Sequence, residues 1–261
     1  IQGPSFTVST ACSSGGDAIN TACMCMQSGK ADIMLAVGAE SVLCPLVIYS
    51  LANAKALSRR NDSPSTASRP FDVTRDGFVI GEGGGALVLE TEEHALARGA
   101  KIYAEIRGCG NTDDAYHVTA PHPEGRGAIA CMKQAIAEAG INPSDIGYIN
   151  AHGTATNKGD TVETSSIKKV FGNTLPYVSS TKGATGHMMG AGGITETITC
   201  VKAIETGTVP PTINLNEVDP ECAGIDFVAN TAKKAEINFA MSNAFGFGGQ
   251  NSSIIVGKYG K

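Results

Sequence analysis

The amino-acid sequence predicts an α/β fold in which helices cover the faces of a sheet. Apolar runs of strand length alternate with segments of helical periodicity along most of the 261 residues. The polar, glycine-rich loops follow the predicted strand ends, where the sites of α/β proteins gather. With 42% apolar and 17% charged residues, the chain can build one large core or two closely packed halves. We place these halves at residues 1–110 and 111–261.

The first half is predicted to begin with a short strand over residues 5–9 and a helix over residues 12–28. Residues 31–40 form a continuous apolar run, which is typical of a parallel strand buried on both faces. A long polar connection over residues 58–77 is either functional or wrapped over the surface. The predicted half ends with strand, glycine turn and strand over 78–90, a helix over 92–98 and a strand over 101–110.

The second half repeats the alternation of strands and helices. Apolar residues recur at helical spacing in three segments, which predicts helices over residues 125–139, 160–171 and 191–206. Strands that run into loops are predicted over residues 147–153 and 176–183. Residues 237–258 are predicted to form two strands joined by a glycine-rich loop.

The composition excludes several classes of protein. The formal net charge is −5 and no basic run is longer than two residues, so we expect no nucleic-acid partner. No apolar stretch reaches 18 residues, so we expect no membrane span. The eight cysteines include no CxxC pair, which favours a reducing compartment and no metal site. We expect a cytoplasmic location; an organellar one stays open because the sequence starts with Ile1 and not with Met.

One cysteine stands out by its position. Cys12, in the stretch STACSSGG, lies between a predicted strand and a predicted helix. Unpaired amide N–H groups and the helix dipole at such a position favour the thiolate, which is the nucleophilic form. The amide of Cys12 could also donate to an oxyanion on a bound carbonyl. The alternative is a buried structural cysteine beside a hydroxyl-rich helix cap.

Two of the five histidines share a sequence context. His152 and His187 each follow a predicted strand and stand beside glycine and threonine residues. A single loop histidine is usually structural, but two in matching loops predict a pairing with Cys12. The charged residues near these loops are Lys182, Asp160 and Glu196. Glu196 is placed to form an ion pair with Lys182, either as an ordinary salt bridge or as a device that orients the histidines.

The glycine-rich segments give a mixed signal. GEGGGA at residues 81–86 resembles a dinucleotide fingerprint, but a strand follows it where a helix is required, so we reject a cofactor there. No phosphate-binding loop and no GxSxG motif of serine hydrolases occurs. In GFGGQN, Phe247 stands between glycines, either as a mobile gate with an oxyanion-binding amide or as a buried aromatic in a tight turn.

The motifs TACSSG, NAHGTAT, KGATGH and GFGG follow one another in that order. This order resembles the elongating β-ketoacyl-[acyl-carrier-protein] synthases of type II, the condensing enzymes of fatty-acid synthesis. Connecting segments such as SRPFDVTRDGFVIGEGGGALVLE also resemble that group, so the resemblance covers essentially the whole chain. It implies a thiolase-like layered fold of two similar halves, each a mixed five-stranded sheet with helices, and a homodimer.

The resemblance also implies the roles of the candidate residues. Cys12 would be the acyl-accepting nucleophile. His152 and His187 would serve the decarboxylation of a malonyl thioester, and Lys182 would support them together with Glu196. The implied reaction is the decarboxylative Claisen condensation of an acyl thioester with malonyl-acyl-carrier protein. Its product is a β-ketoacyl-carrier protein, so the chain would be an acyltransferase of fatty-acid elongation.

The implied partner is the acyl-carrier protein. The enzyme itself would bind no cofactor, because the carrier protein supplies the phosphopantetheine arm. Thr154 and Thr156 would contact this arm, Phe247 would gate the pocket and Asp160 would be a supporting residue. The amides of Cys12 and Phe247 would form the oxyanion hole.

The sequence departs from the family at its start. Only 11 residues precede Cys12, where family members carry roughly 150. We therefore expect the N-terminal part of the first half to be missing, so that this half is incomplete. Two alternatives follow: a catalytically inert fragment of such an enzyme, or a polyketide-type ketosynthase.

Overall fold

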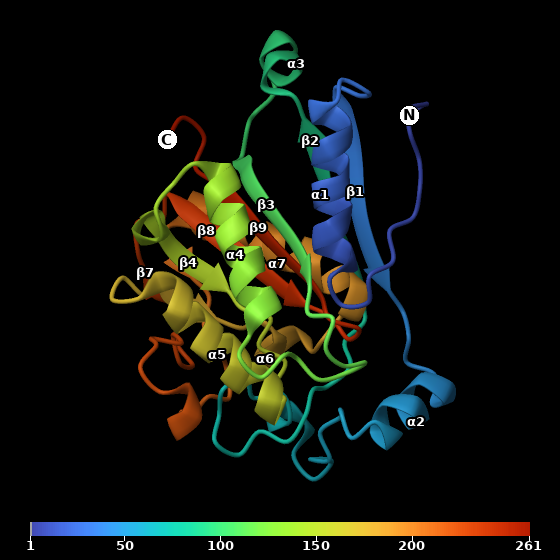
Figure 1. Ribbon diagram of the computed structural model, residues 1–261, viewed down its shortest axis with the longest axis vertical. Helices are drawn as coiled ribbons and strands as arrows, with labels where there is room; N and C mark the ends of the chain where they lie inside the picture. The colour runs from blue at the N-terminus through green and yellow to red at the C-terminus, as the bar shows by residue number, and fades with distance from the viewer. Residues whose placement is uncertain (1) are drawn as a thin grey trace.

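The computed structural model describes residues 2–261. Its main sheet has five strands in the order β3-β9-β8-β4-β5 (Figure 1). β4 runs parallel to β5 and β8, whereas β9 runs antiparallel to β3 and β8. The strands span Glu105–Asp113 (β3), Ile146–Asn150 (β4), Tyr177–Ser179 (β5), Phe239–Phe245 (β8) and Gln250–Gly257 (β9). The predicted mixed five-stranded sheet with helices is confirmed.

Helices cover both faces of this sheet, because neighbouring residues of a strand point to opposite sides. Ile149 and Met241 pack with α4 and α5 in one hydrophobic cluster. Their neighbours Tyr148 and Ala240 pack with α1 and α7 in a second cluster. The helices span Ser14–Gln27 (α1), Arg126–Ala139 (α4), Asn157–Phe171 (α5) and Gly192–Thr206 (α7). Each of them overlaps a helix expected from the sequence.

A second, two-stranded sheet packs on the far side of α7. It consists of β1 (Ile33–Glu40) and β2 (Gly83–Glu90), which pair antiparallel along their whole length. The expectation of a parallel strand buried on both faces over residues 31–40 is therefore wrong. One face of β1 packs on the helices, while Ile33, Leu35 and Val37 on the other face are exposed. Among residues 2–261 no further layer covers this face.

Two more expectations for the first half are corrected. Residues 5–9 form no strand, because no backbone segment among residues 2–261 pairs with them; only an isolated bridge joins Thr10 and Cys12. Residues 83–85 lie within β2 and form no turn. The remaining elements are α2 (Pro45–Asn53), α3 (Glu92–Ala97), α6 (Lys182–Thr185), β6 (Thr208–Val209), β7 (Lys233–Lys234) and 3-10 turns at Pro64–Thr66, Pro143–Asp145, Met189–Ala191 and Pro220–Cys222. The division after residue 110 stays a prediction.

The N-terminal turns of α1 and α7 cross at unusually short range. A Cβ added at Gly193 would lie 2.3 Å from the backbone nitrogen of Gly16, and one added at Gly15 would lie 2.7 Å from that of Ile194. No side chain fits at either contact, because the neighbouring atoms belong to the backbone. The crossing brings the segment before α1, which carries Cys12, against the segment before α7, which carries His187.

Gly193→Ala tests this crossing. We expect it to lower the free energy of unfolding by about 3 kcal/mol, because the methyl group forces the two helices apart. Gly147→Ala is the matched control, since its added Cβ would meet its nearest neighbour at 3.7 Å. Urea denaturation of both variants gives the comparison. Equal stability of the two variants would show that the crossing tolerates side chains.

Candidate active site

Cys12 lies in a tight turn just before α1. The preceding residue, Ala11, has a φ of 53°, in the left-handed region that side chains disfavour. The thiol is nearly buried, with 9% of the residue exposed. Its Sγ lies 3.1 Å from Nε2 of His187. The structure thus joins the candidate nucleophile to one of the two candidate histidines.

The charge state of Cys12 differs from the sequence-based expectation. Burial raises the pKa of the thiol, and the Phe247 amide and the Lys182 charge oppose this only in part. Burial outweighs these effects even though Cys12 stands directly before Ser13, the cap of α1. The resting site therefore holds a neutral thiol beside an imidazole, and His187 can accept the thiol proton when Cys12 attacks.

His187 is held on both sides by backbone hydrogen bonds. The backbone N–H of His187 donates to the backbone carbonyl of Val79, and the backbone carbonyl of His187 accepts from the N–H of Gly81. The Phe78 ring meets the imidazole edge-on at 5.2 Å between centroids. Burial and the nearby charge of Lys182 hold the pKa of His187 well below its usual value. The imidazole is therefore neutral and fixed in orientation.

His152 lies beside His187, with 5.3 Å between ring centroids and an interplanar angle of 86°. The carboxylate of Glu163 accepts hydrogen bonds from the backbone N–H groups of His152 (2.8 Å) and Gly153 (2.7 Å) and so fixes this loop. Burial and Lys182 also hold the pKa of His152 well below its usual value. Sequence reasoning missed Glu163; its spacing from Ile167 and Asp160 on the buried face of α5 could have indicated it.

Lys182 and Glu196 form a buried ion pair behind the histidines. Lys182 is 1% exposed and Glu196 is 4% exposed. Burial raises the pKa of Glu196 and the lysine charge opposes this. The lysine also disfavours protonation of both imidazoles, since two positive charges repel. The pair therefore helps to keep both histidines neutral.

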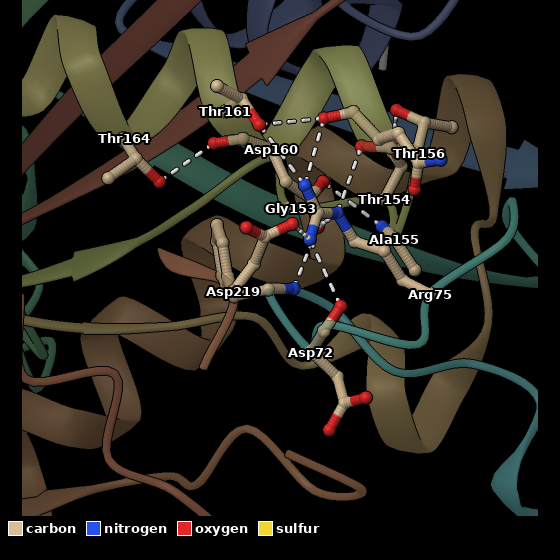
Figure 2. A network of polar contacts seen from close by, with 12 residues as sticks. Asp72, Arg75, Gly153, Thr154, Ala155, Thr156, Asp160, Thr161, Thr164 and Asp219 are labelled. Atoms are coloured by element: carbon tan, nitrogen blue, oxygen red, sulfur yellow. Dashed lines mark hydrogen bonds and ion pairs between the residues drawn. The ribbon is translucent and has the colours of Figure 1, made fainter. Parts of the chain in front are cut away.

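Asp160 takes part in a different network, which includes Arg75 and Asp219 (Figure 2). Its carboxylate accepts the N–H groups of Phe71 at 2.8 Å and Ala155 at 3.1 Å. Arg75 lies 3.6 Å away and donates to the carbonyl of Asn157. Burial raises the pKa of Asp160 to about 7. Asp160 thus supports the threonine loop and makes no hydrogen bond to either histidine.

The threonines of that loop line a small pocket. The hydroxyl oxygens of Thr154 and Thr156 lie 3.1 Å apart. They border a cavity of about 70 Å³ together with His152 and Phe247. A wider groove of about 920 Å³ lies between β2, α7 and residues 100–107, and none of the candidate residues lines it. The small pocket is therefore the one that belongs to the site.

Phe247 lies in the glycine loop between β8 and β9, as the sequence predicts. The neighbouring Gly246 approaches Cys12 so closely that an added Cβ would lie 3.2 Å from the Cys12 backbone nitrogen. The Phe247 amide lowers the pKa of the Cys12 thiol, in opposition to burial. Gly248 and Gly249 have φ values of 92° and 95° and allow this sharp loop.

Residues 2–261 contain neither a metal-binding cluster nor a membrane-spanning helix. No cluster of three or more His, Cys, Asp or Glu side chains there could hold a metal ion. In the same range, no helix combines the length and apolar character needed to cross a membrane.

The comparison with known families fits this geometry. Residues 1–95 match the model described as "Beta-ketoacyl synthase, N-terminal domain", and residues 103–216 match "Beta-ketoacyl synthase, C-terminal domain". The chain belongs to the β-ketoacyl synthase family. The enzyme named 3-oxoacyl-[acyl-carrier-protein] synthase 2 of Rhizobium meliloti (strain 1021) is 48% identical over 99% of this chain. A chloroplastic 3-oxoacyl-[acyl-carrier-protein] synthase II of Arabidopsis thaliana is 46% identical over 99% of this chain and is matched over 48% of its own length.

Solved structures give the same result. A β-ketoacyl synthase from Burkholderia phymatum STM815 superposes with a TM-score of 0.92 at 41% identity, over 96% of this chain and 60% of its own. The complex AntDE:AntF, a type II polyketide acyl-carrier protein with its ketosynthase, gives 0.95 at 39% identity, over 98% and 63%. The chain spans about 62% of the length of the bacterial relatives it matches.

The free energy of unfolding should depend on pH in the way expected for two buried, neutral histidines. Their lowered pKa means that the unfolded chain binds more protons, so stability present above about pH 6.5 is lost as the pH falls. The raised pKa values of Asp160, Glu163 and Glu196 act in the opposite direction. The comparison with His152→Gln/His187→Gln isolates the histidines. Between pH 6.5 and 5.5, we expect the unsubstituted chain to lose about 2 kcal/mol more than this variant in urea titrations. Parallel pH profiles would contradict neutral histidines.

The buried ion pair gives a second prediction. Lys182→Met should cost about 3–5 kcal/mol, because it leaves Glu196 buried without a partner. Adding Glu196→Met should restore most of that loss in chemical denaturation. Lys101→Met serves as the control, since Lys101 pairs with Glu205 on the surface and its loss should change stability little. A double variant no more stable than Lys182→Met would show that the pair is not a coupled unit.

Proposed function

We propose that this chain carries the active site of a β-ketoacyl-[acyl-carrier-protein] synthase of fatty-acid elongation, an acyltransferase. The observation that carries the proposal is the contact of Cys12 with His187, with His152 beside it and all three groups neutral. A thiol, two neutral imidazoles and an amide at the sulfur suit acyl transfer followed by decarboxylation.

Acyl transfer uses Cys12 and His187. The sulfur attacks the carbonyl of an acyl thioester on the carrier protein, and His187 Nε2 takes the thiol proton. The amides of Cys12 and Phe247 donate to the oxyanion of the tetrahedral intermediate. Its collapse leaves the acyl group on Cys12, and the proton passes to the departing carrier thiol.

Condensation uses both histidines. Loss of CO₂ from malonyl-carrier protein leaves an enolate, whose oxygen needs hydrogen-bond donors. Neutral imidazoles supply them through their N–H groups, and Lys182 helps to keep them neutral. His187 takes part in the tautomer with its proton on Nε2, which forms when the imidazolium of the acyl-transfer step gives up its Nδ1 proton to the departing thiolate. The enolate carbon attacks the acyl group on Cys12, the carbon–sulfur bond breaks as the new carbon–carbon bond forms, and the released thiolate takes a proton from water to restore the thiol. The product is a β-ketoacyl-carrier protein that is two carbons longer.

The partner in this scheme is an acyl-carrier protein, which supplies the phosphopantetheine arm; the chain itself holds no cofactor. Thr154 and Thr156 line the small pocket beside His152 and are the proposed contacts of the arm. Phe247 is the proposed gate. The named partner of a structural neighbour, the acyl-carrier protein of AntDE:AntF, supports this proposal. We further propose a homodimer and a cytoplasmic location; the chloroplastic and mitochondrial relatives keep an organellar one open.

Fatty-acid elongation is favoured over polyketide synthesis by the degree of identity. The bacterial relatives named 3-oxoacyl-[acyl-carrier-protein] synthase 2 reach 48%. The polyketide ketosynthase of the AntDE:AntF complex reaches 39% over a similar share of this chain.

Single-turnover assays separate the two half-reactions. Cys12→Ser should abolish acyl transfer from acyl-carrier protein, which intact mass detects as the missing acyl adduct. His152→Ala should slow condensation with malonyl-carrier protein by about 100-fold or more while loading changes only a few-fold. Normal condensation by this variant would refute the assigned role. If the unsubstituted chain neither loads nor condenses, it is the inert fragment.

A further inference from the structure

A buried carboxylate next to the nucleophile has no role in the scheme above. Asp17 lies in the first turn of α1 and is 4% exposed. Its Oδ2 accepts the hydroxyl of Thr10 at 2.5 Å and lies 2.9 Å from the hydroxyl oxygen of Ser13, which shares its proton with the Thr10 carbonyl at 2.8 Å. Its Oδ1 accepts the side-chain amide of Asn111 at 2.6 Å. A buried carboxylate with three donors holds its neighbours firmly.

Two of these donors flank the nucleophile. Thr10 and Ser13 are the residues on either side of the Ala11–Cys12 pair. The turn between them includes Ala11 at a φ of 53°, a conformation that costs free energy and persists only where its surroundings enforce it. Both hydroxyl groups contact the same carboxylate oxygen, so Asp17 links the first and last residues of the turn.

The third donor ties the turn to the main sheet. Asn111 belongs to β3, which pairs with β9. The carboxylate therefore connects the Cys12 turn, helix α1 and the five-stranded sheet at one point. The same sheet carries β8, at whose end the glycine loop of Phe247 begins.

We propose that Asp17 is a positioning residue that holds the Thr10–Ser13 turn so that Cys12 Sγ reaches His187 Nε2. It acts through geometry, because it touches neither Cys12 nor the histidines. The charged groups that act on the Cys12 pKa are Lys182 and Glu196, and Asp17 is not among them. Loss of Asp17 should therefore lower the reactivity of Cys12 by moving Sγ away from His187.

The test is alkylation of the 261-residue chain by iodoacetamide, read by mass spectrometry of Cys12 and of the exposed Cys44 in the same sample. Asp17→Asn and Thr10→Val should each lower the Cys12 rate relative to Cys44 about tenfold, as expected for one lost hydrogen bond to a charged group. Thr10→Ser keeps the hydroxyl and should react like the unsubstituted chain.

Asp72→Asn is the matched control. Asp72 is also buried and accepts hydrogen bonds from the backbone N–H groups of Asn216 and Glu217. None of these partners belongs to the Cys12 turn. This variant should leave the Cys12 rate unchanged even where it lowers the melting temperature. If Asp17→Asn does not fold, the Thr10→Val and Thr10→Ser pair decides. The proposal is overturned by an unchanged Cys12 rate in Thr10→Val, by slowing of Thr10→Ser equal to that of Thr10→Val, or by equal slowing in Asp72→Asn.

The proposal rests on Cys12 being the nucleophile of the proposed function, but alkylation needs neither carrier protein nor thioester. Slow alkylation in Thr10→Val alongside absent condensation in the unsubstituted chain would keep the positioning role and refute the reaction. An unchanged alkylation rate in Thr10→Val alongside normal condensation by the unsubstituted chain would keep the reaction and refute the positioning role.

Discussion

The backbone contact between the first turns of α1 and α7 is the constraint on which the site depends. Gly15 and Gly193 remove the side chains that would otherwise separate the helices. The segments before the two helices then converge, and they carry Cys12 and His187. The loop that follows β4 of the main sheet carries His152, and Glu163 of α5 fixes this loop. Three segments far apart in the sequence thus bring Cys12, His187 and His152 together.

Burial at this meeting point decides the chemistry. It raises the pKa of Cys12 and lowers that of both histidines, so the resting site is neutral. A neutral imidazole can accept a proton from the thiol in one step and donate its N–H to an enolate in another. The buried ion pair of Lys182 with Glu196 lies close enough for the lysine charge to disfavour protonation of both histidines. Cys12 is therefore activated by transfer of its thiol proton to His187 during the attack, and not by a thiolate that is already present in the resting site.

The sequence was enough to predict the helices and the loops of the site. Helical periodicity is a local signal, and the motifs around Cys12, His152, His187 and Phe247 carry the glycines that their turns require. It was not enough for residues 5–9 and 31–40, because strand pairing and two-sided burial depend on partners distant in the sequence. The thiolate expectation failed for a related reason: helix position is readable from sequence, whereas the depth of burial is not.

Other parts of the site depend on contacts that no local pattern encodes. Asp160 stands near the histidine loop in sequence, yet its carboxylate holds Ala155 and Phe71. Glu163 and Asp17 were not singled out, although each holds one of the loops that bring the reactive groups together. Both lie on buried faces of helices that also carry apolar residues, so a charged residue at a core position is the signal to look for.

A neutral thiol beside two neutral imidazoles is tested most directly by nuclear magnetic resonance of the imidazole carbons of His152 and His187. Both rings should keep the chemical shifts of neutral imidazole from pH 8 down to below pH 6. A ring of either residue that titrates near pH 6.5 would contradict it.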